Sequence, residues 1–321
     1  MATRGKQLVR DTLAGQATTA VPFVPLVDTF AARHMQVPVR DFHGNAATLA
    51  KALDMARRLT KADAIVCLPD ATLLAEACGC PVSWNADGPR LLPCPAGTAL
   101  TLEPDQVLSR GRIPVLLDAL ERLRFSVGQE WALFGALTAP HLLSQQLWHG
   151  DLAGALAAGN TEARELVEAT SSVCLQFAHR LGELEIDACL VMDGAEAPHA
   201  AIRELLAPAY ETLATVIAFY GSTPIHHGSG VDWLEAAGIS AFEWSLTNTD
   251  PARGGAQAGR YAAIPEAALR RGAPAVTEAA RGLIEEGARM LGTARAIPAD
   301  VELASVQAVT AASDHTNGRI K

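Results

Sequence analysis

Short apolar runs alternate with amphipathic helical stretches along almost the whole chain. The runs that we interpret as buried strands are Val21–Leu26, Asp63–Leu68, Glu130–Leu137, Cys189–Met192, Thr223–His227, Ser240–Trp244, Arg260–Ile264 and Arg289–Ile297. The stretches between them carry apolar residues at helical spacing, as in Ala46–Leu59. Strands that alternate with helices pair in parallel through right-handed crossovers. The pattern therefore predicts one α/β domain over residues 1–321, a (β/α)8 barrel of the TIM type, with an open doubly wound sheet as the alternative.

The segment Pro81–Pro95 departs from this alternation. Its centre, Asn85-Ala86-Asp87-Gly88-Pro89, is rich in the residues that form tight turns. It predicts a small hairpin outside the barrel, after the second strand. The following stretch, Pro104–Arg124, is predicted to be mostly helical and leads to the third strand.

Most of the predicted strands end in a polar side chain that can carry chemistry. The candidates at or just after strand ends are Asp28, Asp70, Thr138, His141, Asp193, His226, His227 and Glu243. His43, which we expect in a loop, and Glu76 lie close by in sequence. In a parallel barrel the carboxyl ends of all strands face one mouth, where this fold carries its active site. Adjacent strand residues point to opposite faces, so only one of His226 and His227 can face the barrel axis. An enzyme with its active site at that mouth is the expected result.

Composition narrows the class of enzyme. The chain has 321 residues, of which 49% are hydrophobic, and a net charge of −9, so nothing in its charge points to nucleic acid or an anionic membrane as a partner. It shows neither a signal peptide nor the roughly 18–20 apolar residues of a spanning helix. Six cysteines in such a chain are typical of reduced core thiols. We therefore expect a cytoplasmic enzyme that acts on a small molecule.

Several segments resemble, in the same order, the uroporphyrinogen decarboxylase superfamily, which includes the methylcobamide:coenzyme M methyltransferases. The similar segments are Val21–Pro25, Ala62–Ile65 with Asp70, Ala75–Gly79, Phe134–Pro140, Val191–Asp193 and Phe242–Trp244. They extend over nearly the whole chain. The resemblance implies a TIM-type barrel whose mouth faces a porphyrinogen or a methyl donor such as a corrinoid or a folate.

The chain departs from the decarboxylases of that superfamily at two places. Where the resemblance implies an R-Q-A-G-R segment for substrate carboxylates, the chain offers only Arg33 and Arg40, and Leu291–Arg295 replaces an N-L-G-H-G segment. Substrates with many carboxylates need several guanidinium partners, because an unpaired buried carboxylate is costly. The methyltransferase branch is therefore favoured over the haem-pathway decarboxylase.

The methyltransferase branch places zinc at an H-x-C-G segment completed by a late cysteine. This chain has Ile225-His226-His227-Gly228 there, with His227 at the first cysteine position and Thr293 or Ala294 at the late one. The usual cysteine ligands of zinc are thus absent. If a metal is bound, the ligands that we expect are His227 and Glu76.

The sequence predicts a methyltransferase of one-carbon metabolism. Its cofactor would be a corrinoid on a separate protein, since the chain has no D-x-H-x-x-G segment of its own, or tetrahydrofolate. His227, Asp193, Asp70 and Glu243 are the expected catalytic residues; the expected substrate-binding residues are His43, Glu76, Thr138, His226 and Asp28. Two alternatives stay open, a decarboxylase of a carboxylated small molecule or tetrapyrrole and a non-catalytic corrinoid-binding or tetrapyrrole-binding barrel. The resemblance also suggests a homodimer.

Overall fold

Eight parallel strands form a barrel in the computed structural model of the chain. The model describes residues 4–67, 70–95, 97–194, 199–228, 233–234, 237, 239, 242, 244–247 and 259–314. The strands are β1 (Phe23–Val24), β2 (Ala64–Val66), β5 (Ala132–Thr138), β6 (Ala188–Met192), β7 (Thr223–His227), β8 (Trp244–Thr247), β9 (Gly259–Ala263) and β10 (Met290–Gly292). Their order is β1-β10-β9-β8-β7-β6-β5-β2, and all of these pairs are parallel. The backbone N–H of Asp63 donates to the carbonyl of Phe23 over 2.8 Å, which joins the two ends of this order. The predicted (β/α)8 barrel is confirmed.

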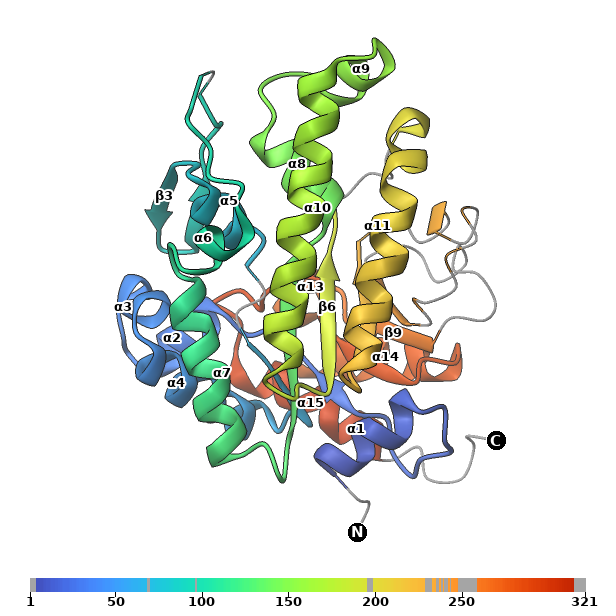
Figure 1. Cartoon of the computed structure of the whole chain (residues 1–321). Helices are drawn as coiled ribbons and strands as arrows, with labels where there is room; N and C mark the ends of the chain where they lie inside the picture. The colour runs from blue at the N-terminus through green and yellow to red at the C-terminus, as the bar shows by residue number, and fades with distance from the viewer. Residues whose placement is uncertain are drawn as a thin grey trace.

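Helices surround the strands on the outside. They are α1 (Lys6–Leu13), α2 (Thr29–His34), α3 (Val39–Gly44), α4 (Ala46–Thr60), α5 (Leu73–Cys78), α6 (Pro104–Leu108), α7 (Ile113–Ser126), α8 (Pro140–Leu147), α9 (Leu152–Ala157), α10 (Thr161–Gly182), α11 (Ala200–Phe219), α13 (Glu266–Arg271), α14 (Ala273–Glu285) and α15 (Leu303–Asp314). In Figure 1 strand β6 points toward the end of the molecule that carries α8 and α9, so the barrel mouth opens at that end. A search of the described helices finds none with the length and apolar character to cross a membrane.

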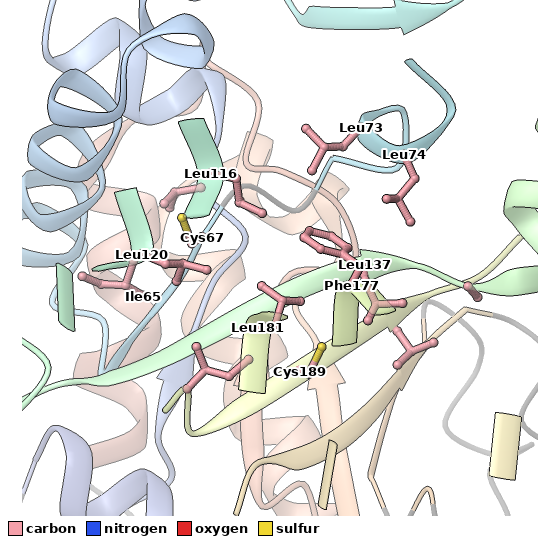
Figure 2. Packing of buried hydrophobic residues seen from close by; sticks show 14 of the residues in the cluster. Ile65, Cys67, Leu73, Leu74, Leu116, Leu120, Leu137, Phe177, Leu181 and Cys189 are labelled. Atoms are coloured by element: carbon pink, nitrogen blue, oxygen red, sulfur yellow. The ribbon is translucent and has the colours of Figure 1, made fainter. Parts of the chain in front are cut away.

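Two apolar layers hold the barrel together, one on each side of the strands. The inner layer draws alternate residues from the strands, such as Val66, Phe134 and Leu190, and α1 closes its lower end with Val9. The outer layer holds the intervening strand residues and the buried faces of the helices. Figure 2 shows part of it, with Ile65 of β2 and Cys67, the first residue after β2, next to Leu116 and Leu120 of α7. This alternation follows from the period of two along a strand, and it tells which side chains enter the barrel.

The hairpin predicted for Pro81–Pro95 is present. Strands β3 (Val82–Asn85) and β4 (Gly88–Leu91) pair antiparallel, and Gly88, the first residue of β4, takes a positive φ of 111° directly after the turn. Figure 1 shows β3 apart from the barrel strands, at the mouth end. The hairpin is therefore an excursion at the rim of the mouth.

The structure refines one local prediction and differs from two others. The mostly helical stretch Pro104–Arg124 consists of α6 and α7, and Gly111 takes a left-handed φ of 57° between them. The sixth barrel strand begins at Trp244, where the prediction ended it, since an apolar run fixes the presence of a strand better than its limits. His43 lies in helix α3 instead of a loop.

All six cysteines are free and buried. Burial raises the pKa of the Cys189 thiol to about 12, and it also raises that of Cys78 to about 12. Such thiols stay protonated at neutral pH, which fits the expected role of the cysteines as core residues.

Candidate active site

His226 and His227 fall on opposite sides of the barrel wall. In the register of β6 and β7, His227 pairs with Met192 of the inner layer, whereas His226 pairs with Val191 of the outer layer. His227 thus faces the barrel interior at the mouth, and His226 faces the surrounding helices. The alternation of side chains along a strand predicted that the two histidines face opposite sides, but it did not tell which of them faces the barrel interior.

The ring of His227 is held in one tautomer. Its Nε2 lies 2.8 Å from the carbonyl oxygen of Ala294, and because a carbonyl only accepts, Nε2 carries the proton and Nδ1 keeps its lone pair. Burial lowers the pKa of His227, opposed by the Ala294 carbonyl and reinforced by the neighbouring His226. The ring is therefore neutral at pH 7, with Nδ1 ready to accept a proton.

The lowered pKa of His227 predicts a loss of stability in mild acid. Between the lowered folded value and the usual value of 6.5, the unfolded chain binds a proton that the folded chain does not, so stability is full above 6.5 and falls as pH drops below it. The slope for one proton reaches about 1.4 kcal/mol per pH unit. Urea unfolding of wild type and His227→Gln, at about pH 7.5 and about pH 5.5, measures it.

His227→Gln is expected to lose less stability in acid than wild type does. The exposed His149 offers the matched control, and His149→Gln should keep the wild-type slope. Equal slopes in all three proteins would contradict the assignment.

Asp193, the first residue after β6, is the centre of a buried polar cluster. Its Oδ1 lies 3.3 Å from Nδ1 of His141 and accepts the N–H of Gly194 over 2.9 Å. Its Oδ2 accepts the hydroxyl of Tyr210 over 2.6 Å and lies 3.5 Å from Nε2 of His226. We call these four side chains, Asp193, His141, Tyr210 and His226, the Asp193 cluster. They come from β7, the end of β6, the first turn of α8 and the middle of α11, and so they join barrel to helices at the mouth end.

Electrostatics in the Asp193 cluster favour an ionised carboxylate. Burial alone would raise the pKa of Asp193, but its interactions with His141 and His226 outweigh burial and hold that pKa well below its usual range. Burial and the adjacent carboxylate raise the pKa of Tyr210 well above its usual value, so its hydroxyl stays a donor. Asp193 thus acts as a fixed anion that orients three side chains.

A second cluster surrounds Arg112, directly before α7. Its guanidinium pairs with Asp70, and its Nε donates to Glu76 over 2.6 Å. Its NH1 lies 3.3 Å from Nδ1 of His43, whose Nε2 lies 3.0 Å from Oδ1 of Asp28. We call this set, Arg112, Asp70, Glu76, His43 and Asp28, the Arg112 cluster. Four residues predicted separately for the site are therefore brought together by an arginine that was not predicted.

Arg112 is buried, and its charge is compensated within the cluster. Burial would lower the pKa of Arg112, but the carboxylates of Asp70 and Glu76 outweigh it and raise that pKa above the usual value. The ring of Trp84, from the hairpin, lies 5.1 Å from the guanidinium. The hairpin therefore covers the Arg112 cluster at the rim of the mouth.

Arg112 and Tyr210 were missed by the sequence analysis for different reasons. Arg112 is the N-cap of α7, where the helix dipole disfavours a cation, and this mismatch is a signal that could have marked it. Tyr210 lies on the buried face of α11 beside Leu206 and Leu213, so its spacing indicates only packing. Its hydroxyl reaches Asp193 through tertiary structure alone.

The other predicted residues have separate places. Thr138, at the end of β5, donates its hydroxyl to the carbonyl of Ala71 over 3.1 Å. Glu243 lies outside the described residues. His227 and Glu76, the expected metal ligands, belong to different sides of the mouth, and the described part of the chain contains no group of three or more His, Cys, Asp or Glu side chains that could hold a metal ion. These residues do not fit a zinc site.

Comparison with known proteins identifies the family to which the chain belongs. The model of the family described as uroporphyrinogen decarboxylase (URO-D) matches residues 4–315. The chain belongs to the uroporphyrinogen decarboxylase family. Among solved structures, a methyltransferase from Methanosarcina mazei superposes with a TM-score of 0.83 and 20% sequence identity, over 96% of this chain and 98% of that chain. This likeness establishes the shared fold. No curated protein sequence matches the chain.

Proposed function

We propose that this member of the uroporphyrinogen decarboxylase family is a methyltransferase of one-carbon metabolism. It would move a methyl group between a donor, a corrinoid carried by a separate protein or a folate, and a small acceptor bound at the barrel mouth. The fold likeness to a methyltransferase over nearly the full length of both chains supports this choice.

The state of Arg112 is the observation that carries the proposal. Binding a substrate with many carboxylates needs guanidinium groups that are free to pair with it. The buried guanidinium of Arg112 is already occupied by Asp70 and Glu76. The other oxygen of Asp70 accepts the N–H of Thr72 over 2.8 Å, so Asp70 is not free to act as the general acid of a decarboxylase either. Imidazole nitrogens at the same end of the barrel, in contrast, are available.

His227 is one of the residues that we place in contact with the substrates. It faces the barrel interior, its Nδ1 carries a lone pair, and the Ala294 carbonyl fixes its ring. A neutral imidazole suits proton transfer close to neutral pH. Asp193 stabilises the ends of β6 and β7, because its backbone N–H donates to the carbonyl of His227 over 2.8 Å.

A donor and acceptor matrix tests the proposal. Purified protein is incubated with methylcobalamin or methyltetrahydrofolate as donor and with tetrahydrofolate or 2-mercaptoethanol as acceptor, while methylated product and carbon dioxide are measured. The proposal predicts transfer in at least one combination, lowered by on the order of 10²–10⁴-fold in His227→Gln. Carbon dioxide release from a carboxylated substrate without transfer would support the decarboxylase. A spectral change of the corrinoid without turnover would support a binding protein.

A further inference from the structure

His141 carries a buried ring nitrogen without a hydrogen-bond partner among the residues that the structure describes. The residue is 1% exposed, and within that part of the chain its Nε2 makes no hydrogen bond. Buried polar atoms are almost always paired in folded proteins, so an unpaired one calls for an explanation such as a catalytic role or a bound group. The sequence places His141 at the mouth, three positions after Thr138, but assigns it no catalytic or binding role.

The other nitrogen of the ring fixes which atom of His141 is available. Nδ1 faces the ionised Asp193 at 3.3 Å, and because a carboxylate only accepts, Nδ1 carries the proton. In the neutral ring Nε2 then holds the lone pair. A carboxylate that orients an imidazole whose far nitrogen is unpaired is the arrangement of a general base.

The surroundings of His141 contain further polar atoms without partners. Both nitrogens of His226 lack a hydrogen bond of good geometry, although Nε2 lies 3.5 Å from Asp193. The indole Nε1 of Trp233 is also buried and unpaired, and its ring lies 5.1 Å from that of Tyr210. Among the described residues, His141 and His226 beside Asp193, and Trp233 beside Tyr210, therefore present unsatisfied atoms, which points to a polar group that binds among them.

We propose that His141 Nε2 takes the proton that a protic methyl acceptor loses, with Asp193 as the residue that positions its ring. The acceptor X–H attacks the methyl carbon with a lone pair on X, and the X–C bond forms. The bond between the methyl group and its donor breaks and leaves its electron pair on the donor. The X–H electrons stay on X, and the proton passes to His141 Nε2. In the reverse direction the same nitrogen returns the proton. This inference rests on the proposed methyl transfer.

The proposal names the chemical class of the acceptor. A ring N–H, as in tetrahydrofolate, or a thiol S–H loses a proton when it is methylated, whereas a tertiary amine becomes a quaternary ammonium ion and loses none. His141 is almost fully buried, which limits exchange of its proton with bulk water, and the proposal takes that proton from the acceptor. We therefore expect N–H and S–H acceptors to depend on His141.

Chemical rescue tests the role of the ring. His141→Ala is assayed with methylcobalamin and, in separate arms, tetrahydrofolate and 2-mercaptoethanol. Methyl transfer is expected to fall by on the order of 10²–10⁴-fold and to be restored by about tenfold or more with added imidazole. His149→Ala, which removes an exposed histidine just after α8, should keep the wild-type rate and show no response to imidazole. A rate in His141→Ala within about twofold of wild type, or a lost rate that imidazole does not raise in a folded variant, would overturn the proposal.

A second measurement needs no turnover and separates the two hypotheses. ¹⁵N NMR of the ligand-free protein reports which ring nitrogen of His141 carries the proton. The wild type should show Nδ1–H, and Asp193→Ala should shift the ring toward Nε2–H. Nε2–H in the wild type overturns the role of His141 whatever the activity. Absence of all transfer in the wild type, together with Nδ1–H, overturns the proposed methyltransferase and with it the proton transfer that we assign to His141.

Discussion

Replacing Asp193 by alanine is expected to lower methyl transfer by on the order of 10²–10⁴-fold, the contribution usual for a positioned acid or base. The substitution removes the acceptor that orients His141 and leaves the buried hydroxyl of Tyr210 without its partner. An unpaired buried donor costs about 1–3 kcal/mol, so the free energy of unfolding should fall as well. Steady-state kinetics and urea unfolding of the same preparation measure both effects.

Asp118→Ala is the matched control for Asp193→Ala. Asp118 is a half-exposed aspartate on α7 that pairs with Arg122 one turn away, so its loss should leave activity unchanged and stability within about 0.5 kcal/mol. The account also predicts that Asp193→Asn folds better than Asp193→Ala, because its amide oxygen can still accept from Tyr210. An Asp193→Ala enzyme with the wild-type rate would contradict the role given to the Asp193 cluster.

Replacing Arg112 by alanine is expected to destabilise the fold by about 3–5 kcal/mol, the cost of removing one partner from a buried ion pair. The carboxylate of Asp70 would stay buried without a cation, and His43 would lose the guanidinium next to its Nδ1. The ring of Trp84 would also lose its contact with the guanidinium that lies over it. Equilibrium unfolding in urea gives the change in free energy.

Arg110→Ala separates this effect from the general loss of an arginine. Arg110 is exposed and donates to the hydroxyl of Thr101, so its removal should change stability by less than about 0.5 kcal/mol. Equal free energies of unfolding for Arg112→Ala and Arg110→Ala would contradict the stabilising role that we assign to the Arg112 cluster.

The fold could be predicted from the sequence because its signal is repeated along the chain. Each apolar run followed by a helical stretch adds evidence for the same parallel barrel, and errors at single ends do not alter the topology. The boundary between α6 and α7 depends on the left-handed conformation of Gly111. In the sequence this boundary is marked by a single glycine, which does not by itself predict where a helix ends. Limits of elements are therefore the part of the fold that pattern alone fixes least.

The candidate site was predicted in part for a similar reason. The position of His227 and Asp193 at strand ends follows from local order, so their place at the mouth end could be foreseen. Which other side chains surround a candidate residue depends on contacts between segments that are far apart in the sequence. Tyr210 meets Asp193 through the docking of α11 on the barrel, and Arg112 meets Asp70 across 42 positions of sequence. The spacing of apolar and polar residues along the chain does not predict such contacts.

The most direct test of the proposed function follows a labelled methyl group. Methylcobalamin carrying a ¹³C methyl group is mixed with tetrahydrofolate or 2-mercaptoethanol and with wild-type, Asp193→Ala or Asp118→Ala protein, and the label is observed by NMR. The account predicts that the label leaves the corrinoid and appears on nitrogen or sulfur with the wild type and with Asp118→Ala, and at a much lower rate with Asp193→Ala. A label that stays on the corrinoid with the wild type, or that moves equally fast with Asp193→Ala, would contradict it.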